Sequence, residues 1–192
     1  MDSAVTKKTA PQGGAALLSA LGEPHVEGEI GACEPMFDLI ELMFFAYRDF
    51  VGDADQLLVN FGLGRAHHRV LHFVNRRPGL TIAELLDILK ITKQSLNRVL
   101  KELLDQDYVE SHPGLSDRRQ RQLFLTARGK ALALDVAQQQ SRRFARVFAQ
   151  LPDGARGDAI DFLLAMVDAS ERDKVAALVA SSEAGAAAGP RR

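Results

Sequence analysis

The chain has 192 residues, of which 46% are hydrophobic and 26% charged, a balance typical of a globular protein with its own core. No apolar run reaches the roughly 18 residues that a membrane-spanning helix needs, and the basic residues near Met1 lead into Ala, Pro and Gly rather than into a signal peptide. We therefore expect a cytoplasmic protein that does not contact a membrane. The single cysteine, Cys33, excludes an internal disulfide and a multi-cysteine zinc site.

Basic charge is concentrated in the middle of the chain. The formal net charge is −1, but residues 64–130 hold 13 Lys and Arg against 7 Asp and Glu, an excess of six basic residues. A basic segment in a nearly neutral chain is typical of a nucleic-acid-binding surface. The central third is therefore the region in which we expect DNA to bind.

The N-terminal third contains a tail and then helices. Residues 1–34 are rich in Gly, Ala and Pro, which predicts a disordered tail. From Pro35, apolar residues recur three and four positions apart on two faces, and Asp53 is placed to begin a second, short helix. A helix that is apolar on two faces needs burial on both sides. Residues 35–62 are therefore predicted to belong to a helical dimerisation region.

The next segment predicts a helix-turn-helix. A helix over Arg65–Asn75 is followed by Pro78-Gly79, and Thr81 with Glu84 forms the capping box of a second helix that reaches Leu89. Thr92 then caps a third helix that runs to about Gln106. Two capped helices separated by the short turn at Lys90-Ile91 are typical of a helix-turn-helix.

The spacing of apolar residues then changes from three or four positions, typical of a helix, to two positions, typical of a strand. Residues 108–112 and 120–125 alternate around a turn-rich loop, which predicts a β-hairpin. Thr126 caps a long helix that ends near Gln150, and one last helix spans residues 160–178. The predicted fold class is mainly α with a small β-hairpin wing. A winged helix-turn-helix over 63–125 is flanked by the dimerisation region, 35–62 and 126–180, and residues 181–192 form a disordered tail.

The exposed face of the third helix carries the candidate base-reading residues. No acidic residue occurs between Thr92 and Lys101, whereas a solvated helix usually interleaves both charges. Arginine suits guanine, and Asn and Gln suit adenine, while the basic residues also suit phosphates. The predicted DNA-contacting residues of this helix are Thr92, Lys93, Gln94, Ser95, Asn97, Arg98 and Lys101.

The hairpin tip carries arginines beside Asp117. A guanidinium on a thin loop can enter a narrow minor groove, where the potential is most negative. We predict that Arg118 and Arg119 contact DNA, with Arg121 near them, and that the short carboxylate of Asp117 holds a neighbouring arginine in place.

Three features together resemble the MarR family of winged helix-turn-helix transcriptional regulators. They are the stretch Leu63-Gly64-Arg65-Ala66-His67-His68-Arg69-Val70-Leu71, the helix-turn-helix, and Asp117-Arg118-Arg119 followed by Leu125-Thr126 and Gly129. The resemblance covers about residues 36–179.

This resemblance implies a function and a mode of assembly. It implies a homodimer whose first and last helices interleave, with one recognition helix in each half-site of an inverted repeat of double-stranded DNA. It makes Arg118 the minor-groove arginine, with Asp117 and Arg119 as its support. It also implies a regulator, most often a repressor, that a small-molecule effector releases. No obligatory cofactor and no metal site are expected.

Candidate effector contacts lie on the helices before the helix-turn-helix. His68 and His72 share one helical face, and Arg48 could meet an anionic effector. Each has an alternative reading, because His67, His68 and His72 can be hydrogen-bonded structural histidines and Arg48 can form a surface ion pair. For Cys33, the acidic neighbours Glu29 and Glu34 disfavour the thiolate that redox sensing needs.

Two other classes of function are weaker interpretations. A winged helix can serve as a protein-interaction module that does not bind DNA, but such a module has no need of an acid-free helix face. The chain contains no Gly-rich phosphate loop, paired catalytic carboxylates or nucleophile elbow, so we expect that it is not an enzyme.

Overall fold

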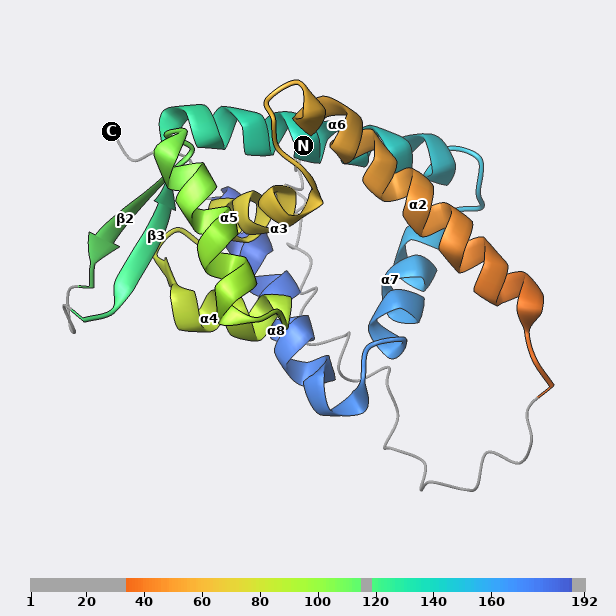
Figure 1. Ribbon diagram of the computed structural model, residues 1–192. Helices are drawn as coiled ribbons and strands as arrows, with labels where there is room; N and C mark the ends of the chain where they lie inside the picture. The colour runs from red at the N-terminus through yellow and green to blue at the C-terminus, as the bar shows by residue number, and fades with distance from the viewer. Residues whose placement is uncertain (1–33, 115–118, 188–192) are drawn as a thin grey trace, which may run out of the picture.

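The computed structural model describes residues 34–114 and 119–187, with side chains described as far as residue 180. The predicted N-terminal tail therefore lies almost wholly outside the described residues. Within them, the chain is mainly helical and has one small antiparallel sheet, which lies at one edge of the molecule (Figure 1), and this confirms the predicted fold class. In chain order the elements are α2 (Phe37–Val59), α3 (Arg65–Arg76), β1 (Leu80–Thr81), α4 (Ile82–Leu89), α5 (Lys93–Asp105), β2 (Val109–Pro113), β3 (Arg121–Leu125), α6 (Ala127–Phe148), α7 (Ala155–Ala165) and α8 (Ala169–Ala187).

The predicted hairpin is present and gains a third strand. Strands β2 and β3 pair antiparallel, with Val109 opposite Leu125 and Pro113 opposite Arg121. Strand β1 pairs with the other edge of β3, which gives the order β1-β3-β2. We did not predict β1, because a two-residue strand is too short to show an alternating pattern.

One apolar core joins the sheet to the helix-turn-helix. The buried faces of α3, α4 and α5 pack against the sheet and the first half of α6, and the end of α2 completes the cluster. This packing fixes which face of α5 is exposed. The fully buried residues of the core include Ala54, Leu58, Val70, Leu71, Val74, Leu85, Leu96, Leu103, Tyr108, Leu123 and Val136.

Helix α2 corrects one expectation. The predicted break at Asp53 is wrong, because the helix runs unbroken from Phe37 to Val59. The Asp53 carboxylate does not cap a helix but accepts hydrogen bonds from the Arg143 guanidinium of α6 at 2.5 and 2.9 Å. These bonds hold the pKa of Asp53 below its usual value. The side chain that indicated a helix start therefore joins two helices instead.

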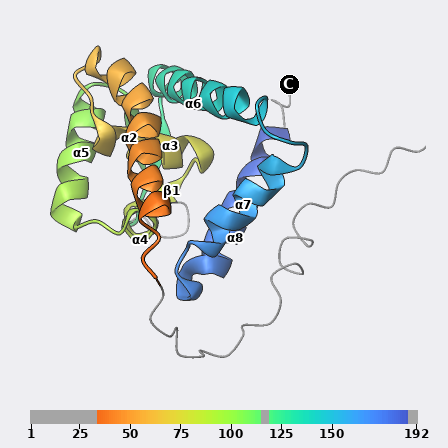
Figure 2. The ribbon, with the colours of Figure 1, turned by 90° about the vertical axis from the view of Figure 1, so that its right-hand side faces the viewer.

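The C-terminal helices also differ from the prediction. The single last helix is interrupted after Ala165, where Arg172 donates hydrogen bonds to the carbonyls of Ala165 and Val167 at 3.0 and 3.2 Å. Helix α8 then continues to Ala187, beyond the residue at which we expected the C-terminal tail to begin. Helix α8 passes behind α3 and α4 in the view of Figure 1, and the turned view shows α7 beside α8 and apart from α2 (Figure 2).

Candidate nucleic-acid interface

Helices α4 and α5, each capped at its N-terminus, form the helix-turn-helix. Thr81 and Glu84 form the predicted capping box, with the Thr81 backbone N–H donating to Glu84 at 2.8 Å and the Glu84 N–H donating to the Thr81 hydroxyl at 3.2 Å. These bonds lower the pKa of Glu84. At the turn between the helices, Lys90 has a φ of 50°. Thr92 caps α5 by accepting the Ser95 N–H at 3.2 Å, so the predicted helix-turn-helix is confirmed.

The structure places every predicted α5 contact on the exposed face. The opposite face of the helix is buried by Leu96, Val99, Leu100 and Leu103, so a rotation of α5 would cost core burial. Among residues 34–114 and 119–187, the side chains of Lys93, Arg98 and Lys101 form no hydrogen bond or ion pair. They are therefore available to contact phosphates or base edges. The exposed residues of this face are Thr92, Lys93, Gln94, Ser95, Asn97, Arg98 and Lys101.

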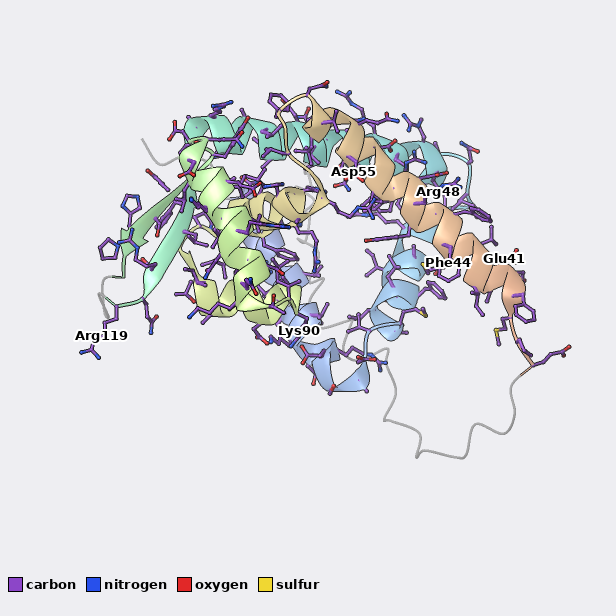
Figure 3. The ribbon with its side chains drawn as sticks, in the orientation of Figure 1. Glu41, Phe44, Arg48, Asp55, Lys90 and Arg119 are labelled. Carbon is purple, nitrogen blue, oxygen red and sulfur yellow. The ribbon has the colours of Figure 1, made fainter. Side chains whose placement is uncertain are left out.

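The wing projects beyond α5, and only part of its tip is described. Asp117 and Arg118 lie outside the described residues. Arg119 is exposed at the end of the hairpin, and its side chain points away from the body of the molecule (Figure 3). Arg121 lies on β3, where its guanidinium donates to the Ser111 hydroxyl at 3.0 Å and to the Ser111 carbonyl at 2.6 Å. Arg121 therefore joins the two strands of the wing.

A close contact fixes the base of the wing to α6. A Cβ placed on Gly129 would lie 1.9 Å from the Tyr108 carbonyl oxygen. Beside it, the Arg128 guanidinium lies 4.3 Å from the centre of the buried Tyr108 ring and donates to its hydroxyl at 2.9 Å. The sequence marked Gly129 only through the family resemblance, and no local pattern revealed that β2 and α6 meet there.

The structure separates the three effector candidates. Arg48 donates to the neighbouring Asp49 at 2.8 Å and lies over the Phe45 ring on the exposed side of α2. Burial lowers the pKa of His68. Burial and the nearby His68, Arg76 and Arg77 lower the pKa of His72 to about 4. Of the three candidates, His72 lines the larger of the two described cavities, and Arg48 and His68 do not line that one.

That cavity has a volume of about 610 Å³ and lies between α3, α4 and α8. Its apolar wall includes Phe73 and Val175, and Arg76 and Arg77 lie at its α3 side. Neither arginine pairs with a carboxylate in the described part of the chain, although Arg77 donates a hydrogen bond to the Leu178 carbonyl. Arg76 lies one helical turn after the predicted His72 and Arg77 follows it, but no sequence pattern distinguishes this pair from other arginines.

Ion pairs hold the cavity's other rim together. Asp87 of α4 pairs with Lys174 of α8, and Lys90, which directly follows α4, pairs with Glu171 of α8. Lys90 also lies at the turn of the helix-turn-helix, so its ion pair with Glu171 connects α8 directly to that motif. Hydrogen bonds from Lys174 and Lys90 lower the pKa of Asp87. The cavity therefore lies where α8 meets the DNA-binding domain.

Two other properties concern the described residues alone. Across residues 34–114 and 119–187, no group of three or more His, Cys, Asp or Glu side chains is placed to hold a metal ion. None of the helices in these ranges is long and apolar enough to cross a membrane. Cys33 lies outside them.

An exposed helix face without acidic residues, a helix-turn-helix and a wing define a winged-helix DNA-binding protein, and known proteins share these features. Residues 61–120 match the model of the MarR family. The HTH-type transcriptional regulator PetP of Rhodobacter capsulatus is 44% identical over 133 residues, which are 69% of this chain and 80% of PetP. The HTH-type transcriptional repressor Rv2887 of Mycobacterium tuberculosis is 37% identical over 81 residues, 42% of this chain and 58% of that protein.

The solved structures agree with the sequence relatives. A MarR transcriptional regulator from Methanosarcina mazei aligns with a TM-score of 0.58 and 26% identity, over 68% of this chain and 94% of its own. The chain belongs to the MarR family of HTH-type transcriptional regulators. It is a regulator of transcription, and the named roles of its relatives agree with the expectation that it is not an enzyme.

Proposed function

We propose that two copies of the chain bind an inverted-repeat operator in double-stranded DNA as a repressor, and that a small-molecule effector releases them. The observation that carries this proposal is the exposed, acid-free face of α5. Lys93, Arg98 and Lys101 have no carboxylate partner among the described residues, so their charge is available to phosphates. The repressor role is supported by the name of the relative Rv2887.

The dimer is supported by large apolar side chains that the single chain leaves uncovered. On the first half of α2, Phe37 and Phe44 are 67% and 69% exposed. On α7, Phe162 and Leu163 are 51% and 52% exposed, and the helix has no buried residue. Exposed patches of this kind mark interfaces between proteins. A second copy would cover both helices and would hold two α5 helices at the fixed spacing that an inverted repeat requires.

DNA binding is tested with a duplex that the full-length chain selects from a random-sequence pool. Arg118→Ala removes a predicted minor-groove contact, so affinity falls for all duplexes and the salt dependence becomes shallower. Asn97→Ala removes a base-edge donor and acceptor, so it changes base preference at one position of each half-site, by about 1–3 kcal/mol.

Fluorescence anisotropy across a salt series separates the two effects. Tight binding by Arg118→Ala at unchanged salt dependence would show that the wing assignment is wrong. Failure of the wild-type chain to select any duplex at low salt would favour the alternative, a winged helix that contacts only other proteins.

The effector is supported by the cavity between α3, α4 and α8. An apolar wall beside two arginines that lack carboxylate partners suits an amphipathic anion, whose charged end would meet Arg76 and Arg77. A ligand there would displace α8 relative to the turn of the helix-turn-helix and so weaken the ion pair between Lys90 and Glu171. The proposal requires no obligatory cofactor.

A thermal-shift screen with aromatic monocarboxylates tests the cavity. A ligand at 100 times its Kd stabilises the folded chain by about 2.7 kcal/mol, and the paired variant Arg76→Gln/Arg77→Gln abolishes that shift. Arg48→Gln is the matched control, because it removes an arginine that the sequence suggested and the cavity does not include. Loss of the shift in Arg48→Gln alone would place the effector elsewhere.

A further inference from the structure

His67 connects the start of α3 to the DNA-reading helix. Its Nδ1 accepts the Gly64 backbone N–H at 3.1 Å, and its Nε2 lies 2.8 Å from Oε2 of Glu102 on α5. Because Nδ1 is the acceptor, the neutral ring carries its proton on Nε2, which donates to the carboxylate. The His67 side chain is 12% exposed and the Glu102 side chain is 45% exposed, so solvent reaches this bond mainly from the carboxylate side.

Glu102 is the first acidic residue after the predicted DNA-contacting face of α5. It follows Arg98 by four residues, and positions four apart lie side by side on a helix. Arg98 is exposed and has no hydrogen-bond or ion-pair partner in the described part of the chain. A Glu102 side chain that was free to rotate would therefore be within reach of Arg98. Such a pair would compete with DNA for the guanidinium.

We propose that His67 is a positioning residue for DNA binding, which holds the Glu102 carboxylate against α3 and thereby keeps Arg98 available to the operator. The inference rests on the proposed function, because it assumes that Arg98 contacts DNA. It assigns a purpose to a histidine that is not among the predicted DNA-contacting residues and does not line the cavity between α3, α4 and α8. It also explains how α5 can carry an acidic residue one turn from Arg98 without losing its basic face.

The size of the effect follows from the strength of a helical ion pair. A pair four residues apart changes an equilibrium about two-fold. A dimer contains two such pairs, so release of Glu102 in both half-sites weakens binding by roughly four-fold when the effects add. The bond from His67 to Glu102 also contributes to folding, and a direct test must separate stability from affinity.

The test measures Kd by fluorescence anisotropy for full-length variants on the duplex that the wild-type chain selects from a random-sequence pool. His67→Ala frees Glu102 and weakens binding about four-fold. His67→Ala/Glu102→Gln removes the competing charge and restores affinity, but its melting temperature stays as low as that of His67→Ala. In an Arg98→Ala background, His67→Ala causes no further loss of affinity.

His67→Gln is the conservative control. Its amide oxygen can accept the Gly64 N–H while its amide nitrogen donates to Glu102, so affinity stays close to that of the wild type. If His67→Ala does not fold, His67→Asn replaces it, because the shorter amide can still accept from Gly64 but falls short of Glu102.

Two results would overturn the inference alone. One is a double variant His67→Ala/Glu102→Gln that binds as weakly as His67→Ala, and the other is an equal loss from His67→Ala with and without Arg98. Both would mean that His67 acts only through stability. If the wild-type chain selects no duplex at all, the proposed function fails and this inference fails with it.

Discussion

Gly129 lies at the start of α6, where this helix packs against the backbone of Tyr108 at the base of the wing. The substitution Gly129→Ala tests this close packing directly. The added Cβ would lie 1.9 Å from the Tyr108 carbonyl oxygen and 2.9 Å from its carbonyl carbon. Both neighbours are backbone atoms, so no side-chain rotation can relieve the contact. The start of α6 must move away from β2 by more than 1 Å, to reach about 3.2 Å or more.

The expected cost is that of an overpacked core. Such changes destabilise by about 1–3 kcal/mol, and the same displacement weakens the hydrogen bond and ring contact between Arg128 and Tyr108. For a chain of this size, the melting temperature falls by roughly 2–4 °C for each kcal/mol. We therefore expect Gly129→Ala to lower it by about 2–12 °C, because the substitution separates α6 from the wing.

Differential scanning calorimetry at one fixed protein concentration measures this shift. Gly157→Ala is the matched control, because Gly157 is also helical and nothing lies within 4 Å of its added Cβ. That substitution should leave the chain as stable or raise stability by up to about 1 kcal/mol, since alanine favours a helix over glycine. Equal melting temperatures for Gly129→Ala and the wild type would refute the close-packing argument.

Two further predictions concern pH and assembly. The pKa of His72 is lowered to about 4 in the folded chain, so the unfolded chain binds the proton more readily and stability falls as pH drops from 7 to 5. Because the His72 side chain is exposed to solvent, we expect a loss of no more than about 1 kcal/mol, which His72→Gln removes in urea titrations at both pH values. Phe44→Glu places a charge on the exposed part of α2 and should convert the dimer to monomer in light scattering. Val59→Glu, at a residue 71% exposed near the other end of α2, should remain dimeric, and a dimeric Phe44→Glu variant would contradict the proposed interface.

The helix-turn-helix could be predicted from local sequence because local physics determines it. Thr81 with Glu84 and Thr92 with Ser95 satisfy the backbone N–H groups of their own helices within a few residues. The buried side chains of α5 recur at helical spacing, so the exposed face followed from the same pattern. The two wing strands could be predicted in the same way, because apolar and polar residues alternate over the five residues of each strand.

Other features depended on contacts between residues far apart in the chain. Asp53 has the character of a helix cap, but Arg143, 90 residues later, pairs with it inside an unbroken helix. Arg121 was expected among the arginines of the tip, yet its partner is Ser111 on the neighbouring strand. Arg76 and Arg77 became candidates for anion binding only because α8 packs beside them and forms a cavity there.

The amino-acid sequence by itself determined the family, the two capped helices and the acid-free face of α5, because caps, periodicity and charge act over a few residues. Only the tertiary structure decided what each polar group meets across the fold: Glu102 against His67, Asp53 against Arg143, and α8 against the helix-turn-helix turn. Such pairings depend on how whole helices pack, and no short stretch of sequence specifies that packing. For the same reason, the residues that read DNA could be named from the sequence, whereas the histidine that we propose keeps Arg98 available could not.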